Sequence, residues 1–570
     1  MPSQIELMPS SLFSSSSRFG ALFLLMLIWL GLSLFIGLPP FADALFGLFH
    51  WGFALEVGFA FAVIALVQAR RERVSGWLIH VFAAIGTFLL ALRLADLTAQ
   101  SVVNRSLNMF LDVSLLPALW DVAQSLIGRS LALGAVTGII VLLVTFYALC
   151  VLALRRASGC LATSQARRGF AMICVAGIAV FAAQRTVFAE VPGWRPFGAS
   201  ASLVFRQQSE QLVDTIVRRA VFRADLATDA ADDITPERLL VGLDDRDIII
   251  VYIESYGVTA LDEPQYANVI LPRLDSMQEA AEDAGFAMKS GRMVGVSAGG
   301  QSWLNHASFT AGRFIDDQTL YALFLAERPR TLIHDFEMTG RRTVQIKPAI
   351  TLPWPEGERL GYQATWEAAE MGYQGPNFYW GIVPDQFALD FFARTELEIA
   401  DRPPLFASIA LISSHAPWLP VPDVVGWDEL GDGSVFERWT RNAPEAREVW
   451  RDQDSIRTQY ALSVGHSIDA VAKFLRDRVA DDALVVVLGD HQPAPLITGP
   501  DASRAVPVHV FSGDESVLAP FADLGFVSGI LPEAAPAGGD AALSRMEDFR
   551  PFLLEAFSRD PEPPGLRAWR

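Results

Sequence analysis

The sequence predicts an N-terminal membrane domain of five helices, followed by an α/β domain whose central sheet is mostly parallel. Two observations carry this prediction. Hydrophobic residues make up 51% of the 570 residues and charged residues only 19%, and the apolar excess is concentrated in the first third of the chain. Beyond that third, short β-branched runs alternate with helical patterns, which is typical of a sheet covered by helices.

Charge divides the chain at the same place. Residues 1–190 carry 12 arginines, no lysine and 8 acidic residues, whereas residues 191–570 carry the other 33 basic and 56 acidic residues. A strongly acidic C-terminal part argues against nucleic-acid binding, which needs a basic face. All three cysteines lie in the apolar third, so the acidic part can form no disulfide and offers no thiolate.

Five apolar segments are long enough to cross a bilayer, which takes about 20 residues. They are Phe19–Leu38, Leu45–Val67, Trp77–Leu94, Leu131–Leu154 and Phe170–Phe188. No A-x-A cleavage site follows the first segment, so we expect an uncleaved helix rather than a signal peptide.

Arginines between these segments predict the orientation. They lie between the second and third segments and between the fourth and fifth, and loops rich in arginine are usually cytoplasmic. These arginines are Arg70, Arg71, Arg73, Arg155, Arg156, Arg167 and Arg168. We therefore expect a multi-pass protein of the bacterial cytoplasmic (inner) membrane, with everything after Phe188 on the extracytoplasmic, periplasmic side.

The expected domain boundaries follow from these patterns. Residues 1–190 form the transmembrane domain, and residues 191–246 form a juxtamembrane helix and an acidic linker. Residues 247–560 form the catalytic domain, and residues 561–570 are a proline-containing tail.

Three apolar runs in the catalytic domain, Asp247–Ile253, Leu405–Ile412 and Ala483–Leu488, predict buried parallel strands. Each run is followed by polar residues. The first leads into Glu254 and Ser255, the second into Ser413-Ser414-His415, and the third into Gly489-Asp490-His491. Ligands of open α/β sheets bind at the carboxyl ends of strands, so we expect Glu254, His415, Asp490 and His491 to meet at one edge.

Two carboxylates and an imidazole suit Mn²⁺, Mg²⁺ or Zn²⁺. Each residue also has a simpler interpretation on its own: Glu254 as a partner of a helix N-terminus, and Asp490-His491 as a turn. Their shared position after apolar runs favours the metal site.

A glycine-bearing loop, Ser297-Ala-Gly-Gly-Gln-Ser302, leads into a helical pattern and offers a nucleophile. A serine at a helix N-terminus sits in a positive dipole that favours anions, and a metal ion would activate its hydroxyl. The alternative is that Ser302 is only the N-cap of the helix.

These motifs together resemble the lipoteichoic acid synthase and phosphoethanolamine transferase group of the alkaline phosphatase (sulfatase) superfamily. The matching residues are Ile-Glu254-Ser, Gly-Gly-Gln-Ser302-Trp, Ser-Ser-His415-Ala-Pro-Trp and Leu-Gly-Asp490-His491. The resemblance implies an alkaline-phosphatase-like (sulfatase-like) catalytic domain.

The resemblance also implies that Glu254, Ser302, Asp490 and His491 surround one divalent ion, with Mn²⁺ favoured and Mg²⁺ or Zn²⁺ as alternatives. Ser302 would attack the phosphorus of a lipid headgroup. His415 would contact the phosphate or protonate the leaving alkoxide. The best-known members of this group carry threonine where Ser302 stands, and serine offers the same alkoxide chemistry.

Two departures narrow the expected reaction. Ser302 lacks the proline and arginine context of sulfatases, which argues against sulfate-ester hydrolysis. Phosphoethanolamine transferases usually carry disulfides in this domain, and this chain has no cysteine there. That difference favours the glycerophosphate branch.

Lys347 and Trp354 lie where relatives place headgroup contacts, although Lys347 also fits a surface lysine. The segment Trp380–Asp385 resembles one near the site of relatives, with packing and a turn as its alternative.

The expected function is a membrane-anchored transferase that works through a phospho-Ser302 intermediate. It would move a phosphoglycerol-type (or phosphoethanolamine-type) headgroup from a phospholipid to an extracytoplasmic glycan or lipid acceptor. The alternatives are a phosphodiesterase or sulfatase-like hydrolase with the same site, and an inactive membrane-anchored scaffold. His306, His334, His466 and His509 have no partner that the sequence identifies.

Overall fold

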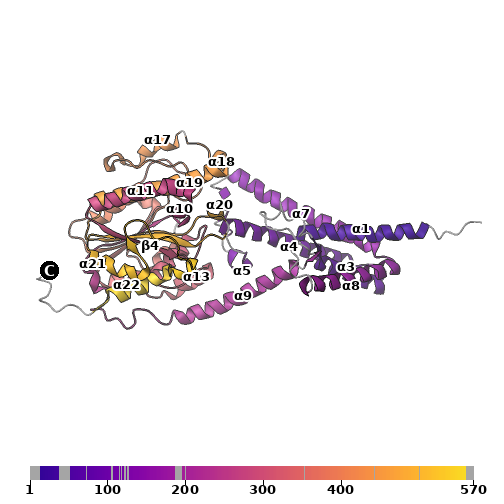
Figure 1. Ribbon diagram of the computed structural model, residues 1–570. Coiled ribbons are helices and arrows are strands. Elements are labelled where there is room, and N and C mark those ends of the chain that lie inside the picture. Colours follow the sequence, from indigo (N-terminus) through magenta and orange to yellow (C-terminus); the bar gives the residue numbers. More distant parts are fainter. Residues whose placement is uncertain are drawn as a thin grey trace, which may run out of the picture. The chain divides into compact units, whose positions relative to one another are not determined.

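The computed structural model describes residues 13–36, 52–71, 74–103, 107–113, 116, 119–120, 123–124, 128–186, 196–198, 200–351, 354–441, 443–499 and 501–559. The predicted tail, residues 561–570, lies outside these ranges. The chain forms two compact units (Figure 1). The first comprises residues 1–100, 106–112 and 129–215, and the second comprises residues 101–105, 113–128 and 216–570.

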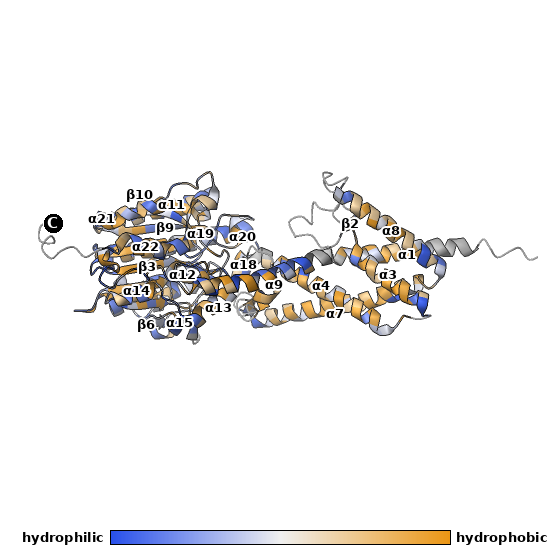
Figure 2. Ribbon diagram, turned by 90° about the horizontal axis from the view of Figure 1, so that it is seen from below, coloured by the Kyte–Doolittle hydropathy of each residue, from blue (hydrophilic) through white to orange (hydrophobic). Residues whose placement is uncertain are grey.

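The first unit is helical. Its long helices are α1 (Phe13–Ile36), α3 (Leu55–Arg70), α4 (Gly76–Val103), α7 (Arg129–Cys160) and α8 (Ser164–Thr186). Their shared core is built around the buried rings of Trp29, Phe61 and Phe170. Trp29 Nε1 donates a hydrogen bond of 2.7 Å to Ala54 O in β1 (Phe53–Ala54), which pairs with β2 (Phe197–Gly198). Most residues along α7 are hydrophobic (Figure 2).

Three described helices are long and apolar enough to cross a membrane: Gly76–Ala99, Arg129–Cys160 and Ser164–Gln184. The prediction of five spans is not confirmed. The apolar part of α1, Gly20–Leu34, is shorter, and α3 has only 16 residues. The second predicted span was placed from Leu45, but α3 begins at Leu55 because β1 precedes it. Residues 45–51 lie outside the described ranges.

The helix α9 (Ser200–Asp225) corresponds to the predicted juxtamembrane helix, and its residues from Ile216 onward belong to the second unit. That unit is built on a nine-stranded sheet in the order β10-β4-β9-β8-β3-β7-β5-β6, with β11 paired to β4. The strands are β3 (Ile248–Ile253), β4 (Ala287–Val294), β5 (Arg342–Lys347), β6 (Ala364–Glu367), β7 (Leu405–Ala410), β8 (Leu484–Gly489), β9 (Ala505–Ser512), β10 (Val527–Ser528) and β11 (Ser544–Arg545).

The three strands predicted from apolar runs form the centre of this sheet, where β8, β3 and β7 are parallel neighbours. Strands β5 and β6 continue the parallel part. However, β9 runs antiparallel to β8, and β4 and β10 follow in the same alternating way. The prediction of a mostly parallel sheet was therefore wrong, and the sheet is mixed. The connection from β8 to β9 holds only the short helix α20 (Pro495–Thr498), not the crossover helix that usually joins parallel strands.

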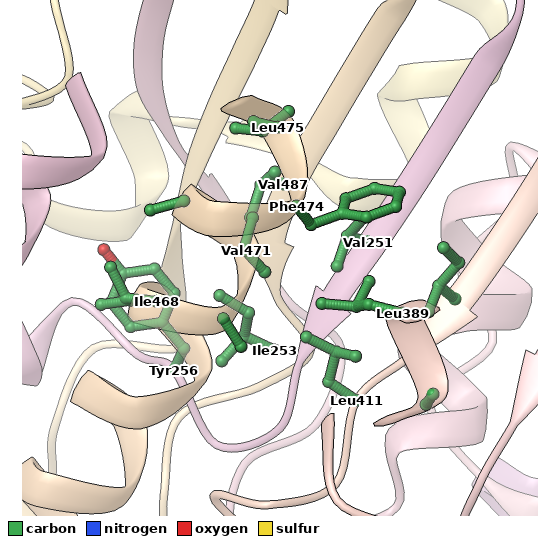
Figure 3. Close-up of a cluster of buried hydrophobic side chains, with 14 of the residues drawn as sticks. Val251, Ile253, Tyr256, Leu389, Leu411, Ile468, Val471, Phe474, Leu475 and Val487 are labelled. Atoms are coloured by element: carbon green, nitrogen blue, oxygen red, sulfur yellow. The ribbon is translucent and has the colours of Figure 1, made fainter. Parts of the chain in front are cut away.

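Helices cover both faces of the sheet because successive strand residues point to opposite sides. On one face, Val251 and Ile253 of β3 pack against α11 (Pro264–Asp283), α16 (Asp385–Phe392) and α19 (Gln453–Arg478). Figure 3 shows Val251 and Ile253 beside side chains of α19, namely Ile468, Val471 and Phe474.

On the other face, Ile250 and Tyr252 of β3 pack with the apolar sides of α12 (Ser302–Ala311), α14 (Leu332–Met338) and α22 (Phe549–Phe557). Both faces of β3 are fully buried. This explains the uninterrupted apolar run in its sequence. Glu254, the polar residue that follows this run, is therefore held by a strand that is buried on both sides.

Candidate metal centre and nucleophile

Three buried side chains with metal-binding atoms gather at the carboxyl edge of the sheet. Glu254 follows β3, and Asp490 and His491 follow the neighbouring parallel strand β8. One ligand atom from each residue lies within 4.8 Å of the others. The structure therefore brings these three residues together, as the sequence predicts. Their role as ligands stays a prediction.

His491 presents one ring nitrogen to this cluster. Its Nδ1 lies 2.8 Å from Gln492 O, and because a carbonyl only accepts, Nδ1 carries the proton. Nε2 lies 3.3 Å from Glu254 Oε1 and 3.8 Å from Asp490 Oδ2. This buried nitrogen has no hydrogen bond among the described residues. A hydrogen bond at Nδ1 that leaves Nε2 for a metal is the usual arrangement of a ligating histidine.

Main-chain amides fix the orientation of Asp490. Its Oδ1 accepts hydrogen bonds of 2.7 Å from the amides of Ser255 and His491. Glycine is required just before it, since a Cβ on Gly489 would lie 1.7 Å from Tyr256 O. The close approach of the two strand ends therefore depends on Gly489.

Two carboxylates lie close together in a buried space, so the charge of one opposes the ionisation of the other. Burial and the neighbouring charge of Glu254 raise the pKa of Asp490 to about 8. Burial alone would lower the pKa of His491, but Asp490 and Glu254 outweigh it and raise that pKa to about 9. Burial also opposes ionisation of Glu254, yet the charge of His491 holds the pKa of Glu254 below its ordinary value.

This donor set fits a divalent cation. It offers two carboxylates and His491 Nε2, a nitrogen that makes no hydrogen bond among the described residues and becomes a ligand once its proton is released; these are ligands of Mn²⁺, Mg²⁺ and Zn²⁺. A cation would replace the protons that now relieve the repulsion between Glu254 and Asp490.

Ser302 lies beside this cluster as the first residue of α12. Its Oγ donates a hydrogen bond of 3.3 Å to Glu254 Oε2. The N-cap position is held by Gln301, in the left-handed region with φ 65°. The alternative that Ser302 is only the helix cap is therefore not supported, because its hydroxyl faces Glu254 instead of a main-chain amide.

A buried asparagine that the sequence analysis missed holds the loop before Ser302. Asn305 Oδ1 accepts a hydrogen bond of 2.7 Å from the amide of Val296, and its Nδ2 donates one of 2.7 Å to Ser297 Oγ. Ser297 Oγ in turn donates to Gly300 O at 2.8 Å. The loop is also anchored to the segment that follows β8, where the amide of Gly299 donates to Gln492 O at 2.7 Å.

The segment that carries His415 follows β7 at the same edge. Ser414 Oγ donates a hydrogen bond of 2.6 Å to the main-chain oxygen of Glu254. His415 Nδ1 donates to Ala416 O at 2.7 Å, which leaves Nε2 for other partners. The placement of His415 near Glu254 agrees with the predicted edge, and its contact with phosphate stays a prediction.

Asp385 fixes the position of the segment that carries His415. It ends the stretch Trp380–Asp385, for which the sequence offers either a place near the site or a turn. Its Oδ1 accepts hydrogen bonds from the amides of Ile412 and Ser413 at 2.7 and 2.8 Å. Its Oδ2 accepts one of 2.6 Å from Ser467 Oγ on α19. Asp385 is fully buried and acts only on other protein groups, so it positions the segment of His415.

Lys347 and Trp354 lie together at the end of β5. Lys347 Nζ is 5.8 Å from the centre of the Trp354 ring and 3.3 Å from His306 Nδ1. Lys347 is half-buried and lines a cavity, so it is not an ordinary surface lysine.

Three other histidines lie away from the cluster. His509 in β9 contacts Ser290 Oγ at 2.9 Å and the hydroxyl of Tyr256 at 3.1 Å. His334 pairs with Thr331 at the N-terminus of α14. His466 lies in the buried face of α19.

Several known structures are similar to parts of this chain. Streptococcus pyogenes phosphoglycerol transferase GacH, in complex with sn-glycerol-1-phosphate, is 15% identical. That match covers 62% of this chain and 90% of GacH, with a TM-score of 0.36. Lipoteichoic acid synthase LtaP from Listeria monocytogenes is 14% identical, covering 49% and 70%, with a TM-score of 0.33.

A protein in the alkaline phosphatase superfamily from Vibrio parahaemolyticus is 14% identical, covering 56% of this chain and 70% of that one, with a TM-score of 0.34. No protein-family model matches the chain, and no curated protein gives a significant match. Because these TM-scores lie below 0.5, the function is inferred from the site itself.

Proposed function

We propose that the protein is a membrane-anchored, metal-dependent phosphotransferase. It moves a phosphoglycerol-type headgroup from a membrane phospholipid to an extracytoplasmic glycan or lipid acceptor. The observation that supports this most is the 3.3 Å hydrogen bond from Ser302 Oγ to Glu254, within a cluster of three potential ligands. A hydroxyl beside a cation site at the start of a helix is suited to attack on phosphorus.

Glu254, Asp490 and His491 would hold the cation, with Mn²⁺ as the first candidate. When bound, the cation withdraws charge from the Ser302 oxygen and from the phosphoryl oxygens. The protein's part is to hold the oxygen of Ser302 at a fixed place. The hydrogen bonds of Asn305 to the preceding loop do this before any substrate arrives.

In the first step, Ser302 Oγ forms a bond to phosphorus, and the bond between phosphorus and the diacylglycerol oxygen breaks. The hydroxyl proton leaves through Glu254, which already accepts it in a hydrogen bond. His415 supplies a proton to the leaving alkoxide. In the second step, an acceptor hydroxyl gives its proton to His415 and forms a bond to phosphorus, the bond between phosphorus and Ser302 Oγ breaks, and the proton held by Glu254 returns to Ser302.

The three apolar helices of the first unit would keep the catalytic domain at the membrane that contains its donor. The arginine bias puts the catalytic domain outside the cytoplasm. A reporter that is active only outside should be active when fused after Ala227 and silent when fused after Arg73. The reverse result would contradict this orientation.

Mass spectrometry of the detergent-solubilised full chain, incubated with phospholipids and Mn²⁺, tests the reaction. We expect a headgroup adduct on Ser302 and released diacylglycerol. Transfer of the adduct to an added glycan acceptor would support the transferase, whereas quantitative loss to water would indicate a phosphodiesterase. If neither adduct nor diacylglycerol forms with any phospholipid, the protein is not an enzyme of this kind.

A further inference from the structure

The helix α9 carries a row of exposed apolar side chains, which we call the α9 stripe. Its members are Phe205, Val213, Ile216, Val217 and Val221, and each is between 54% and 76% exposed. At about 100° per residue these positions fall within an arc of about 160°, so they form one continuous stripe along the helix. Contiguous exposed apolar surface of this kind marks a place where something else binds.

Charged residues border the α9 stripe on both sides. Arg219 and Arg223 follow one edge, and Glu210 and Asp214 follow the other; all four are exposed. An apolar stripe between charged rows that include arginines is typical of a helix lying in the headgroup region of a bilayer. Arginine side chains at such a boundary reach the lipid phosphates while their stems stay on apolar surface.

The chain enters α9 from the helical unit. β2 pairs with β1 in that unit, and α9 begins two residues after β2 ends. The helix belongs to this unit up to Thr215 and to the second unit from Ile216 onward. Gln208 fixes its first half, because its Nε2 donates to Leu107 O at 2.7 Å and its Oε1 accepts from the amide of Met109 at 2.9 Å. The α9 stripe is therefore continuous in the chain with the unit that holds the three apolar helices, which favours their bilayer as its partner.

The opposite face of α9 packs against the nucleophile helix. Phe222 lies about 180° from the middle of the α9 stripe and is only 7% exposed. It joins the core that contains Leu304 of α12 and residues of α13 (Gln318–Glu327). Arg218 Nη1 lies 3.7 Å from Oδ2 of Asp317, the N-cap of α13. The α9 stripe and the helix that begins with the proposed nucleophile are thus held on opposite sides of one helix.

We propose that the α9 stripe lies in the headgroup region of the bilayer that contains the apolar helices of the first unit. Its apolar side chains enter the acyl boundary, and Arg219 meets the phosphates of anionic lipids. Because α12 packs on the other face of α9, this contact sets the height of Ser302 above the bilayer. The inference rests on the proposed function and adds a membrane contact that places the nucleophile at the phosphodiester of the donor.

Lipid contact is measured without turnover. Val217→Cys is labelled with the fluorophore NBD in the full chain, in nanodiscs of phosphatidylcholine and phosphatidylglycerol with plain or brominated acyl chains. We expect bromine to quench the label at Val217→Cys but not at Ser276→Cys, on the exposed side of α11. The unsubstituted chain, treated in the same way, gives the background from its three native cysteines. No quenching at Val217→Cys would overturn the inference, whether the α9 stripe then faces water, the first unit or a second copy of the chain.

The reaction tests the placement of Ser302. Ile216→Glu/Val217→Glu/Val221→Glu puts three charges on the α9 stripe. With phosphatidylglycerol in nanodiscs and Mn²⁺, diacylglycerol release should fall about 10-fold or more, because a shift of about 1 Å in the reacting groups can cost about 100-fold. With the deacylated, water-soluble donor glycerophosphoglycerol, glycerol release should be unchanged, since this donor needs no bilayer. Ile216→Leu/Val217→Leu/Val221→Leu keeps the stripe apolar and should behave like the wild type.

A charge-matched control separates lipid contact from added charge. Met338, Ile399 and Leu531 are also 44% to 52% exposed but lie outside α9, and replacing all three by glutamate should leave both rates unchanged. In the α9 variant, an equal loss with both donors would overturn the inference, because the stripe would then act through the fold of α12. No loss with either donor would also overturn it. A wild type that cleaves neither donor would contradict the proposed function, whereas the quenching experiment would still decide whether α9 contacts lipid.

Discussion

Two clusters in the second unit of the structure each contain two carboxylates, and they differ in what neutralises them. In the first, Asp229 and Asp335 both accept hydrogen bonds from the buried guanidinium of Arg550, at 2.7 to 2.9 Å. Arg330 adds a further bond of 2.6 Å to Asp335. Every charge in this cluster has a partner of opposite charge.

In the second cluster, Glu254 and Asp490 have only His491 between them, and its Nε2 makes no hydrogen bond among the described residues. The first cluster is an ion-pair network in which every charge is paired, and it links α22 and α14 to the segment that contains Asp229. The second is neutralised by bound protons instead, because the pKa of Asp490 is raised to about 8 and that of His491 to about 9. The difference teaches that burial alone does not identify a functional site, whereas a buried acidic cluster that only protons neutralise points to one.

The largest effect is expected from Ser302→Ala, which removes the proposed nucleophile beside the second cluster. Diacylglycerol release should fall by at least about 10⁴-fold, as for other lost nucleophiles. Metal binding should be partly retained, because Glu254, Asp490 and His491 remain. Ser276→Ala on the exposed side of α11 is the control and should be fully active. Near-normal activity in Ser302→Ala would move the nucleophile to Ser255 or Ser297.

The two clusters should respond in opposite ways to the same substitution. Asp490→Asn should weaken Mn²⁺ binding at least about 10- to 100-fold. It should leave the metal-free protein about as stable as before at neutral pH, since asparagine keeps the accepting oxygen and replaces a carboxyl whose raised pKa keeps it protonated. Asp335→Asn should destabilise the protein by about 3–5 kcal/mol, because the charge of Arg550 is then poorly paired, and should leave Mn²⁺ affinity unchanged. Calorimetry and thermal unfolding measure both quantities. If the two variants behaved alike, the contrast between the clusters would be wrong.

A smaller effect is expected from Asp385, which positions the segment of His415 without touching the cluster. Asp385→Ala should lower kcat by about 10- to 100-fold with KM and Mn²⁺ affinity nearly unchanged, because the misplaced segment still folds. Asp385→Asn keeps an oxygen for the amides of Ile412 and Ser413 and should recover part of the rate. Loss of Mn²⁺ binding in Asp385→Ala would show that this residue supports the metal site instead.

The smallest effect is expected in the pH dependence of the stability of the metal-free protein. The pKa of Asp490 is raised to about 8 and that of His491 to about 9, so the folded state holds protons that the unfolded state releases. The stabilisation from Asp490 is full below about pH 4 and is lost as the pH rises to about 8, whereas that from His491 is full below about pH 6.5 and is lost by about pH 9. We expect Tm to fall by about 2–4 °C per kcal/mol over this window.

Saturating Mn²⁺ should flatten this curve, since the cation replaces the protons. Asp490→Asn should flatten it without metal, whereas Arg550→Lys in the first cluster should lower the whole curve and keep its slope. A wild-type curve that is flat without metal would contradict the neutralisation of the second cluster by bound protons.

The sequence allowed the strand-end residues to be predicted because their signal is local. An apolar run that stops at Glu254 or Asp490 shows both the strand and its polar end in consecutive residues. Asn305 and Asp385 carry no such signal, because their partners are main-chain amides and hydroxyls supplied by the fold. Only their burial and hydrogen bonds in the structure reveal them.

The direction of a strand and the length of a helix could not be predicted from local sequence patterns, for a similar reason. A buried strand reads as the same apolar run whether its neighbour is parallel or antiparallel, so β9 and β4 could not be oriented. The second predicted span merged apolar residues of β1 with those of α3, since hydropathy does not distinguish a strand from a helix.

One oxygen atom links the metal ligand to the nucleophile loop. Gln492 O accepts hydrogen bonds from His491 Nδ1 and from the amide of Gly299 at the same time. In the proposed reaction, a phosphoryl group attached to Ser302 would shift the loop and so weaken the hydrogen bond that orients the imidazole ring. The cation would then stay on the protein longest with the free serine and leave fastest from the phosphorylated form.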